Sequence, residues 1–559
     1  MRNYMEEYKY WIDSNVIDRK TRAELESIAG NEKEIEGRFR QMMTFGTGGL
    51  RQVMKAGIST MNIYTVRYAT QALANVVKRE GGESVVIAYD SRNNSPLFAK
   101  ESACVLAANG IKAYLFESLR PTPELSFAVR ETGSTAGINI TASHNAKEYN
   151  GYKVYWSDGG QIAGDKADEI ANEIASIDIF ADVVTLSYDK AKAGGFIEVI
   201  GAEIDEKYLE NVLAQSVGKK YVEKYGKEIS VVYTPFHGAG YKLVPEVMNR
   251  IGVKIIPVEE QMVVDGNFPT VKSPNPENRE GFAMAIESAK RVGADIVIGT
   301  DPDSDRCGCA VRNGDDYEIL SGNKMACLMM DYLISVRKEN GNMPENPYIC
   351  KSIVSTLMAD KICKDNGIPL VKVLTGFKFI GEKIAEFERA GNGNFLFGFE
   401  ESLGFLTGTY TRDKDAILAS MLLAEITCYY KDKGMTVYEG LEALYEKYGY
   451  FAELNESIWF EGYDAQEKMS EVMVKLRNEP PAELGAEVVN VVDYLGEVLG
   501  FTKSNVLEYE LADGCQVFVR PSGTEPRVKT YILAQGASRS DAQARLKTMS
   551  EAINKLLRN

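Results

Sequence analysis

The stretch Ile296-Val-Ile-Gly-Thr-Asp-Pro-Asp-Ser-Asp-Arg306 joins an apolar run to a loop in which three carboxylates alternate with other residues. The apolar run, Ile296–Ile298, predicts a buried strand, so the loop lies at the strand's carboxyl end. Asp301, Asp303 and Asp305 offer hard oxygen ligands that suit a divalent cation such as Mg2+. Aspartate is also common in turns, but three like charges in one turn repel one another unless a cation lies among them. The loop therefore indicates a metal site.

Two known uses of alternating aspartates can be compared with this loop. A calcium-binding EF-hand loop that began at Asp301 would need Gly at its sixth position and Glu at its twelfth. Arg306 and Arg312 stand there, and a strand rather than a helix is expected before the loop. A phosphatase that forms an aspartyl phosphate also has an Asp-x-Asp pair after a strand. The loop alone leaves that alternative open, with Asp301 as the nucleophile.

The whole chain of 559 residues has the composition of a soluble globular protein, 45% hydrophobic and 26% charged. Its length predicts about three or four domains. The net charge of −16 argues against a nucleic-acid partner, whose phosphates need basic patches. The charged N-terminus lacks the apolar core of a signal peptide, and no apolar run approaches the roughly 18 residues of a membrane span. We expect a cytoplasmic protein with no membrane partner.

Cysteine and histidine usage agrees with that expectation. Eight cysteines are scattered along the chain and none forms a Cys-x-x-Cys pair, which predicts reduced thiols that mostly fill the core. Only two histidines occur, His144 and His237, which excludes a metal centre built from several histidines.

One unit recurs three times: an apolar strand, a stretch with helical periodicity, and a second apolar strand that ends in a polar loop. The strand pairs and loops are Val85–Ile87, Gly137–Ile140 and Thr141–Asn145; Val231–Tyr233, Ile296–Ile298 and Asp301–Arg306; and Tyr348–Cys350, Phe395–Phe397 and Gly398–Ser402. The repetition predicts an α/β fold with three similar domains. Because ligands bind at the carboxyl ends of strands in such sheets, the three loops are expected to converge on one cleft.

The region after Gly449 differs, since short β-rich runs precede a terminal helix that we expect to be capped at Ser540. This order predicts a small α+β domain. The first ~40 residues read as a helical extension, with Thr21-x-x-Glu24 as a capping box. We therefore expect four domains, at residues 1–207, 208–321, 322–448 and 449–559.

Ser143 lies in the first of the three loops. A small hydroxyl there can simply cap a helix, but the equivalent loop of the next unit is the predicted metal site. A serine that faces Mg2+ can carry a phosphoryl group, because the alcohol is regenerated on transfer. No Gly-x-Ser-x-Gly elbow is present, so a Ser-His-Asp hydrolase is not indicated. Lys153, a little further along, is either a solvated lysine or a general acid or base beside the phosphate.

Two further segments carry polar groups suited to a sugar phosphate. Paired arginines, hydroxyls and a glycine predict a phosphate cradle, because guanidinium groups bind phosphate bidentately; the residues are Arg520, Ser522, Gly523, Thr524 and Arg527. Glu400, Glu401 and Ser402 suit the neighbouring hydroxyls of a sugar, although they also suit a helix N-terminus. The glycine-rich Phe45–Arg51 matches neither a Rossmann nor a Walker pattern, and Arg51 is a candidate for an anion contact.

Taken together, these segments resemble the α-D-phosphohexomutase superfamily, which includes phosphoglucomutases and phosphomannomutases. Four loops match in the family's order, one per domain: Thr141-Ala-Ser-His-Asn145, Asp301–Arg306, Gly398-Phe-Glu-Glu-Ser402 and Arg520-Pro-Ser-Gly-Thr-Glu-Pro-Arg527. Three shorter segments are also similar: Phe45–Arg51, Asp90-Ser-Arg92 and Thr375-Gly-Phe-Lys378. Ser304 departs from the pattern, since the family usually has Gly or Ala there. Phe399 precedes the glutamates as in the longer members.

The resemblance implies three mixed sheets between helices and a fourth domain like the TATA-binding protein, arranged around a central cleft. It implies that Ser143 carries the phosphoryl group and that Ser143, Asp301, Asp303 and Asp305 hold Mg2+. Lys153 is expected as the general acid or base. Arg51, His144, Arg306 and Lys378 are expected to assist. The substrate would be gripped by Glu400 and Ser402 at the sugar and by the loop from Arg520 to Arg527 at the phosphate that does not react.

The implied reaction interconverts glucose 1-phosphate and glucose 6-phosphate through glucose 1,6-bisphosphate, which would be both intermediate and activator. Mannose and pentose phosphates remain alternative substrates on the same scaffold. An aspartyl-phosphate phosphatase and a sensor of sugar phosphates without catalysis are the less favoured functions. The protein would be a monomer or a homodimer.

Overall fold

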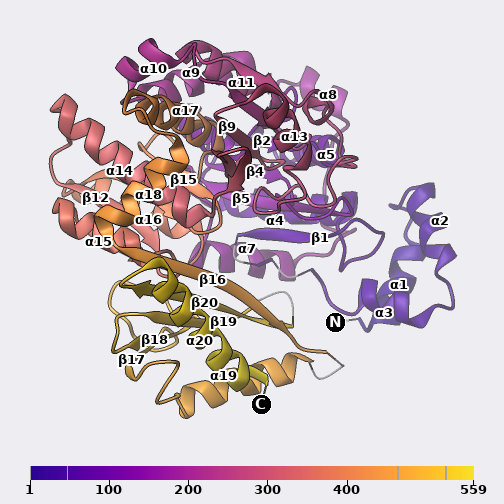
Figure 1. Ribbon diagram of the computed structural model, residues 1–559. Coiled ribbons are helices and arrows are strands. Elements are labelled where there is room, and N and C mark those ends of the chain that lie inside the picture. The colour runs from indigo at the N-terminus through magenta and orange to yellow at the C-terminus, as the bar shows by residue number, and fades with distance from the viewer. Residues whose placement is uncertain (1, 44, 47, 462–464, 523–525, 559) are drawn as a thin grey trace.

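The computed structural model describes residues 2–43, 45–46, 48–461, 465–522 and 526–558. Four β-sheets follow one another along the chain, and we call each sheet with its helices the first to the fourth unit. Three helices precede the first sheet and lie to one side of it (Figure 1): α1 Tyr4–Asp13, α2 Arg19–Ser27 and α3 Glu32–Phe39. The helical extension predicted for the first ~40 residues is therefore confirmed.

The caps of two helices differ from the predicted ones. Helix α2 begins at Arg19, two residues before Thr21, and is capped by the Asp18 carboxylate, which accepts a hydrogen bond from the Thr21 nitrogen at 2.8 Å. The terminal helix α20, Arg539–Arg558, likewise begins before Ser540, and the Ser538 hydroxyl accepts from the Asp541 nitrogen at 3.2 Å. In both cases a good acceptor lies just upstream of the expected one.

The first unit has a six-stranded sheet in the order β1-β5-β4-β2-β3-β6. Its strands are β1 Gly49–Val53, β2 Ser84–Tyr89, β3 Lys112–Phe116, β4 Ala136–Ile140, β5 Tyr149–Trp156 and β6 Ile197–Ile200. Its helices are α4 Ile63–Arg79, α5 Ser95–Ala108, α6 Thr122–Glu131, α7 Gly164–Ser176 and α8 Tyr188–Ala193.

The second and third units have smaller sheets, in the orders β11-β10-β9-β7-β8 and β13-β12-β14-β15. The strands are β7 Val231–Thr234, β8 Ile255–Pro257, β9 Ile296–Thr300, β10 Cys307–Asn313, β11 Asp316–Ile319, β12 Pro347–Ser352, β13 Leu370–Val373, β14 Asn394–Glu400 and β15 Gly404–Leu406. The helices are α9 Ala202–Ala214, α10 Lys219–Tyr225, α11 Gly240–Ile251, α12 Glu259–Met262, α13 Ala283–Val292, α14 Gly322–Asn340, α15 Leu357–Asn366, α16 Phe377–Ala390, α17 Ala416–Asp432 and α18 Val437–Tyr448.

The predicted repeat is visible in the strand pairing. The two strands of each repeat are parallel neighbours, β2 with β4, β7 with β9, and β12 with β14. In each unit the second of these strands then forms an antiparallel hairpin, β4 with β5, β9 with β10, and β14 with β15. The mixed sheets are thus confirmed, and each of the three polar loops is the tip of an equivalent hairpin.

The fourth unit is an antiparallel sheet in the order β16-β20-β19-β18-β17, packed against two helices. Its elements are β16 Tyr450–Trp459, α19 Ala465–Asn478, β17 Val488–Asp493, β18 Leu507–Leu511, β19 Gln516–Pro521, β20 Arg527–Gly536 and α20. This arrangement confirms the predicted α+β domain. In Figure 1 it lies below the other three units.

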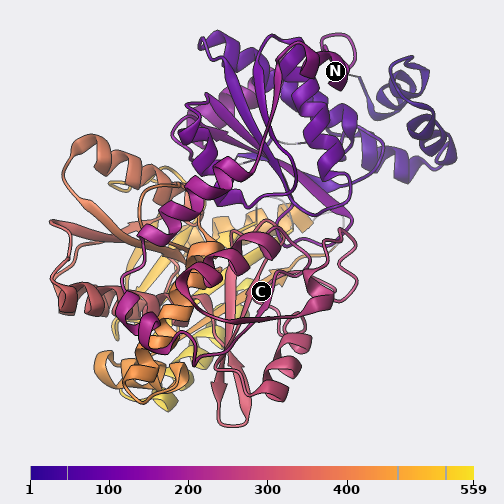
Figure 2. The same cartoon turned by 90° about the horizontal axis from the view of Figure 1, so that it is seen from above.

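Helix α17 joins the units into one structure. Every residue from Ala416 to Tyr430 is buried, because this helix packs on α10 and α11 of the second unit as well as on α14 and α18. One hydrophobic core accordingly runs through the first three units. Figure 2 shows the second and third units lying together on one side of the first. The hairpin tips are therefore held at fixed positions relative to one another.

Candidate active site

The three equivalent hairpin tips share a strained backbone. Ser143, Ser304 and Leu403 have φ values of 51°, 50° and 64°, in the left-handed region that residues other than glycine seldom adopt. Such strain persists only where the surrounding structure enforces it, and it is frequent at functional sites.

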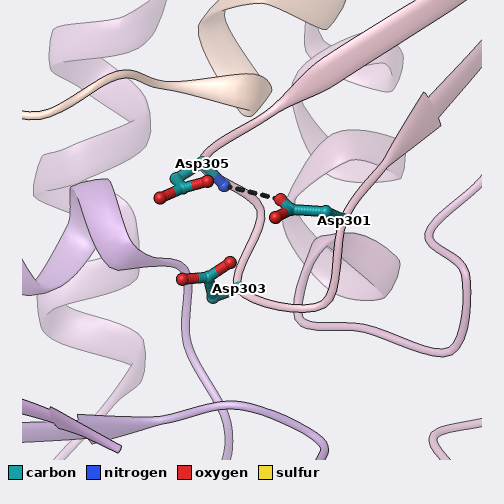
Figure 3. Close-up of side chains that lie close together, drawn as sticks. All are labelled: Asp301, Asp303 and Asp305. Atoms are coloured by element: carbon teal, nitrogen blue, oxygen red, sulfur yellow. Dashed lines mark hydrogen bonds between the residues drawn. The ribbon is translucent and has the colours of Figure 1, made fainter. Parts of the chain in front are cut away.

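The aspartate loop is completely enclosed. Asp301, Asp303 and Asp305 are at most 1% exposed. One Asp301 oxygen, Oδ1, accepts hydrogen bonds from the backbone nitrogens of Asp305 at 3.1 Å and Arg306 at 3.0 Å. The three carboxylates point toward one another, as Figure 3 shows together with the bond from Asp305 to Asp301. The three carboxylates of the loop therefore lie together in the protein interior.

These carboxylates fit a divalent cation. One oxygen from each can be chosen so that all three lie within 4.8 Å of one another. The Oδ1 atoms of Asp303 and Asp305 are buried and have no hydrogen-bond partner among the described residues. A buried carboxylate oxygen without a partner is costly unless a cation satisfies it. The donor set is all oxygen, as Mg2+ prefers.

Two lysines partly balance the negative charge. Lys153 lies 2.9 Å from Asp303 and 3.5 Å from Asp305, and Lys414 lies 2.8 Å from Asp305. Burial and the two neighbouring carboxylates nevertheless raise the pKa of Asp301 well above its usual range. The guanidinium groups of Arg51 and Arg306 add further positive charge beside the same carboxylates.

Lys414 was not identified from the sequence. Its segment, Arg412-Asp-Lys-Asp415, places four charges directly before the apolar helix α17. That dense charge beside a buried helix was an available signal. Thr122 was also missed, and its hydroxyl donates to Asp303 Oδ2 at 2.9 Å. A lone threonine carries no comparable signal.

Ser143 lies against the aspartate loop of the second unit. Ser143 is 3% exposed, and its hydroxyl donates a hydrogen bond to Asp301 Oδ2 at 2.8 Å. The Ser143 hydroxyl oxygen also lies 3.1 Å from His144 Nδ1. Burial, helped by the charges of Arg306 and Arg51, lowers the pKa of His144 well below its usual value, so the ring is neutral at pH 7. The structure therefore brings the predicted nucleophile and the predicted metal ligands into contact.

Arg51, Arg306 and Lys153 surround this junction. Arg51 donates to the Asn145 side chain at 3.2 Å, and Arg306 lies 3.7 Å from Glu277. Lys153 reaches the aspartates, as described above, and no hydrogen bond joins it to Ser143 among those the structure describes. Arg51 and Arg306 thus add positive charge beside the carboxylates that the Ser143 hydroxyl contacts.

The glutamates of the third hairpin differ in their surroundings. Glu400 accepts from the Gly376 nitrogen at 2.7 Å, and burial together with Glu401 raises its pKa to about 7. Glu401 instead accepts from the Ser352 hydroxyl at 2.8 Å, which ties it to its own sheet. Ser402 is partly exposed. Both glutamates are buried, with 5% of Glu400 and 9% of Glu401 exposed, and they differ in their hydrogen-bond partners.

The predicted phosphate loop lies between β19 and β20. Gly523 and Thr524 fall outside the described residues. The Ser522 nitrogen donates to the Arg527 carbonyl at 2.8 Å, and the Arg527 guanidinium lies 4.8 Å from the centre of the Trp459 ring. Burial and the charges of Arg527 and Arg520 lower the pKa of Lys529.

Lys378 belongs to the third unit. It lies in the first turn of α16, two residues after Gly376, which donates to Glu400. Burial lowers the pKa of Lys378, and the charge of Arg520 adds to that effect. Lys378 of the third unit and Arg520 of the fourth therefore lie close enough for their charges to interact.

Comparisons with known proteins agree with this arrangement. Models of the phosphoglucomutase/phosphomannomutase α/β/α domains I, II and III match residues 42–179, 206–314 and 321–448. The chain belongs to the phosphoglucomutase/phosphomannomutase family. A phosphoglucomutase of Staphylococcus saprophyticus is 34% identical over 520 residues, which cover 90% of this chain and 92% of that protein.

Solved structures of the family share the fold. The phosphoglucomutase pp63/parafusin from Paramecium, in an open form, has a TM-score of 0.71 and 17% identity, covering 93% of this chain and 96% of that one. N-acetylphosphoglucosamine mutase from Aspergillus fumigatus, in complex with glucose 1,6-bisphosphate, has a TM-score of 0.51 and 14% identity, covering 96% and 99%. Within the described residues, none of the helices has the length and apolar character needed to cross a membrane.

Proposed function

We propose that this enzyme interconverts glucose 1-phosphate and glucose 6-phosphate through a phosphoserine at Ser143. The observation that carries the proposal is the contact across two units between the Ser143 hydroxyl and Asp301 of the buried aspartate loop, at 2.8 Å. A serine held beside a site for a divalent cation suits the acceptance and return of a phosphoryl group. The phosphoglucomutase of Staphylococcus saprophyticus, similar over most of its length, supports glucose as the sugar.

The transfer needs no other covalent chemistry. The free hydroxyl of the sugar phosphate attacks the phosphorus on Ser143, so the bond to the serine oxygen breaks as the bond to the sugar oxygen forms. The hydroxyl proton ends on Ser143, and we assign Lys153 to move it. The resulting glucose 1,6-bisphosphate turns around in the cleft. Its other phosphoryl group then returns to Ser143 by the same exchange in reverse.

Magnesium is the proposed cofactor. Asp301, Asp303 and Asp305, with an oxygen of the phosphate on Ser143, would hold it, and the partnerless Oδ1 atoms of Asp303 and Asp305 support this assignment. When bound, the ion neutralises charge on the transferring phosphoryl group. Arg51, His144 and Arg306 would orient that group within the enclosed site.

Recognition of the substrate is assigned to the third and fourth units. Glu400 and Ser402 would bind sugar hydroxyls, and Lys378 would assist there. The phosphate that does not react would be held by Arg520, Ser522, Gly523, Thr524 and Arg527, where the cations that lower the pKa of Lys529 support an anion site. Glucose 1,6-bisphosphate, found with the Aspergillus mutase, is the proposed intermediate and activator.

The less favoured functions fit the geometry less well. A phosphatase with Asp301 as nucleophile is less favoured, because it would leave no role for the Ser143 hydroxyl that donates to Asp301 at 2.8 Å. Mannose and pentose phosphates remain alternative substrates.

We propose a cytoplasmic location, which the eight buried free cysteines support. We also propose the domain limits 1–207, 208–321, 322–448 and 449–559.

The test combines a coupled assay with peptide mass spectrometry. The wild-type enzyme should convert glucose 1-phosphate with a higher kcat/KM than mannose or ribose 1-phosphate, and its Ser143 peptide should carry one phosphate. Ser143→Ala should fold normally but lose the mutase reaction. Near-normal turnover by Ser143→Ala, or label trapped on Asp301 with net release of phosphate, would reject the proposal.

A further inference from the structure

The side chain of Arg92 is among the largest fully buried groups of the protein, with the residue 1% exposed. Its guanidinium donates to the backbone carbonyls of Ala146 at 2.9 Å and Tyr149 at 3.1 Å, and also to those of Ser143 and Asn145. One planar group therefore binds three carbonyls of the hairpin loop that carries Ser143 and a fourth at the start of β5. A lysine cannot reproduce that fork of donors.

Asp90 completes this arrangement from the other side. The Asp90 carboxylate accepts hydrogen bonds from the Thr141 hydroxyl at 2.7 Å and from the backbone nitrogen of Arg92 at 2.9 Å. It also lies 3.3 Å from Nε of the Arg92 side chain. The Thr141 hydroxyl in turn accepts from the Ser143 nitrogen at 2.8 Å. Both the amide and the carbonyl of Ser143 are thus tied, directly or through one residue, to the Asp90–Arg92 pair.

These bonds act on a residue in an unfavourable conformation. Ser143 has a φ of 51°, which costs an L-residue about 1 kcal/mol or more. The conformation places its hydroxyl 2.8 Å from Asp301. Without the bonds to its carbonyl and amide, Ser143 is expected to relax toward a negative φ and to turn its hydroxyl away from the aspartate loop.

The second unit packs against the segment that contains Arg92 and Asn93. The ring of Phe268 lies 5.2 Å from the Arg92 guanidinium carbon, and the Asn93 side chain donates to Asn267 at 3.0 Å. The backbones meet so closely that a Cβ on Gly266 would lie 2.4 Å from the Asn93 nitrogen. Arg92 therefore touches the Ser143 loop on one side and, on the other, the unit that carries Asp301.

We propose that Arg92 is a positioning residue for phosphoryl transfer, which holds Ser143 in its strained conformation opposite the aspartate loop. The proposal rests on the proposed function, because it assumes that Ser143 carries the phosphoryl group. Arg92 acts through the backbone of the loop and touches neither the phosphoryl group nor the sugar.

The decisive variant is Arg92→Lys, which keeps the charge next to Asp90 but loses the fork. We expect kcat to fall about 100-fold, since a displacement of about 1 Å in a reacting group has an effect of that size. KM should change by less than about threefold, because the groups assigned to the sugar and the distant phosphate lie in other units. Single-turnover loss of phosphate from the Ser143 peptide, on addition of glucose 6-phosphate, should slow by the same factor as kcat.

Arg38→Lys provides a matched control. Arg38 is 8% exposed and binds Glu24 at 2.7 Å and Glu34 at 2.9 Å in the helical extension, away from Ser143. Its variant should lose stability without a comparable change in kcat. If Arg92→Lys and Arg38→Lys lower kcat only in proportion to the folded fraction seen in thermal melts, the positioning role is wrong.

Chemical rescue separates positioning from folding. Millimolar guanidinium added to Arg92→Ala should restore part of kcat, and it should not do so for Arg38→Ala. Absence of rescue in a folded Arg92→Ala variant contradicts the proposal. The outcomes also separate the two hypotheses: a phosphorylated Ser143 with wild-type transfer in Arg92→Lys rejects only the role of Arg92, whereas full activity in Ser143→Ala rejects the proposed function itself.

Discussion

The junction of Ser143 with the aspartate loop and the loop between β19 and β20 are built in opposite ways. At the junction, Ser143 and all three aspartates are almost completely buried and are tied by hydrogen bonds from two units. In the other loop, Arg520, Ser522 and Arg527 are only half-buried. The first region is organised before any ligand binds, whereas the second remains accessible to one.

The difference matches the two tasks assigned to these regions. Phosphoryl transfer depends on fixed positions and on charges that need not reorganise. A bisphosphate that turns around must be released and gripped again by its outer phosphate, which a less enclosed loop on a separate sheet allows. Substitutions at the junction should therefore affect kcat, and substitutions in the outer loop should affect KM.

The largest effect is expected for Asp301→Asn. The amide can still accept the backbone bonds of Asp305 and Arg306, so the fold should persist, and loss of one of three repelling charges should leave the metal-free melting temperature unchanged or higher. We expect kcat to fall about 1,000-fold and the stabilisation of the protein by added Mg2+ to disappear. Calorimetry and the coupled assay measure both; retained Mg2+ binding would contradict the assignment of the metal site.

Arg527→Ala should have the next largest effect, and mainly on KM. A guanidinium that binds phosphate contributes about 1.5–3 kcal/mol, so KM should rise about 10- to 100-fold with little change in kcat. Arg545→Ala is the control, because Arg545 lies in the same unit and pairs with Asp513 at 2.8 Å. An equal rise of KM in both variants would show that the outer loop has no special role.

The two glutamates of the third hairpin should differ. Glu400→Gln removes the carboxylate that we assign to a sugar hydroxyl and should raise KM about 10-fold for glucose 1-phosphate. Glu401→Gln should stay within about threefold, since an amide oxygen can still accept from Ser352. Steady-state kinetics of both variants decide the matter, and a larger effect of Glu401→Gln would reverse the assignment of the sugar contact.

The smallest effect is expected for Ser304→Gly. Glycine adopts a φ of 50° without strain, so stability should change by no more than about 1 kcal/mol and activity should stay near that of the wild type. Urea unfolding measures the difference. A large loss of activity would mean that the Ser304 hydroxyl, which donates to the Asp301 carbonyl at 3.3 Å, contributes more than its geometry indicates.

Several features of the protein were predictable because they depend on residues close together in the sequence. The alternation of apolar runs and helical stretches specified three similar α/β units and a separate β-rich end. The carboxylates of Asp301–Arg306 predicted a metal site, and the arginines of the Arg520–Arg527 loop predicted a phosphate site. Local patterns succeed for the strands because strand burial depends mainly on neighbouring side chains.

Other features were decided only by the tertiary structure. The contact of Ser143 with Asp301, the ion pair of Lys414 with Asp305, the fork of Arg92 on the Ser143 loop and the complete burial of α17 all join residues that are far apart in the sequence. The sequence shows which groups each loop carries, but not which loops touch. Those contacts arise because packing around one shared core fixes the hairpin tips against one another, and no single segment encodes that packing.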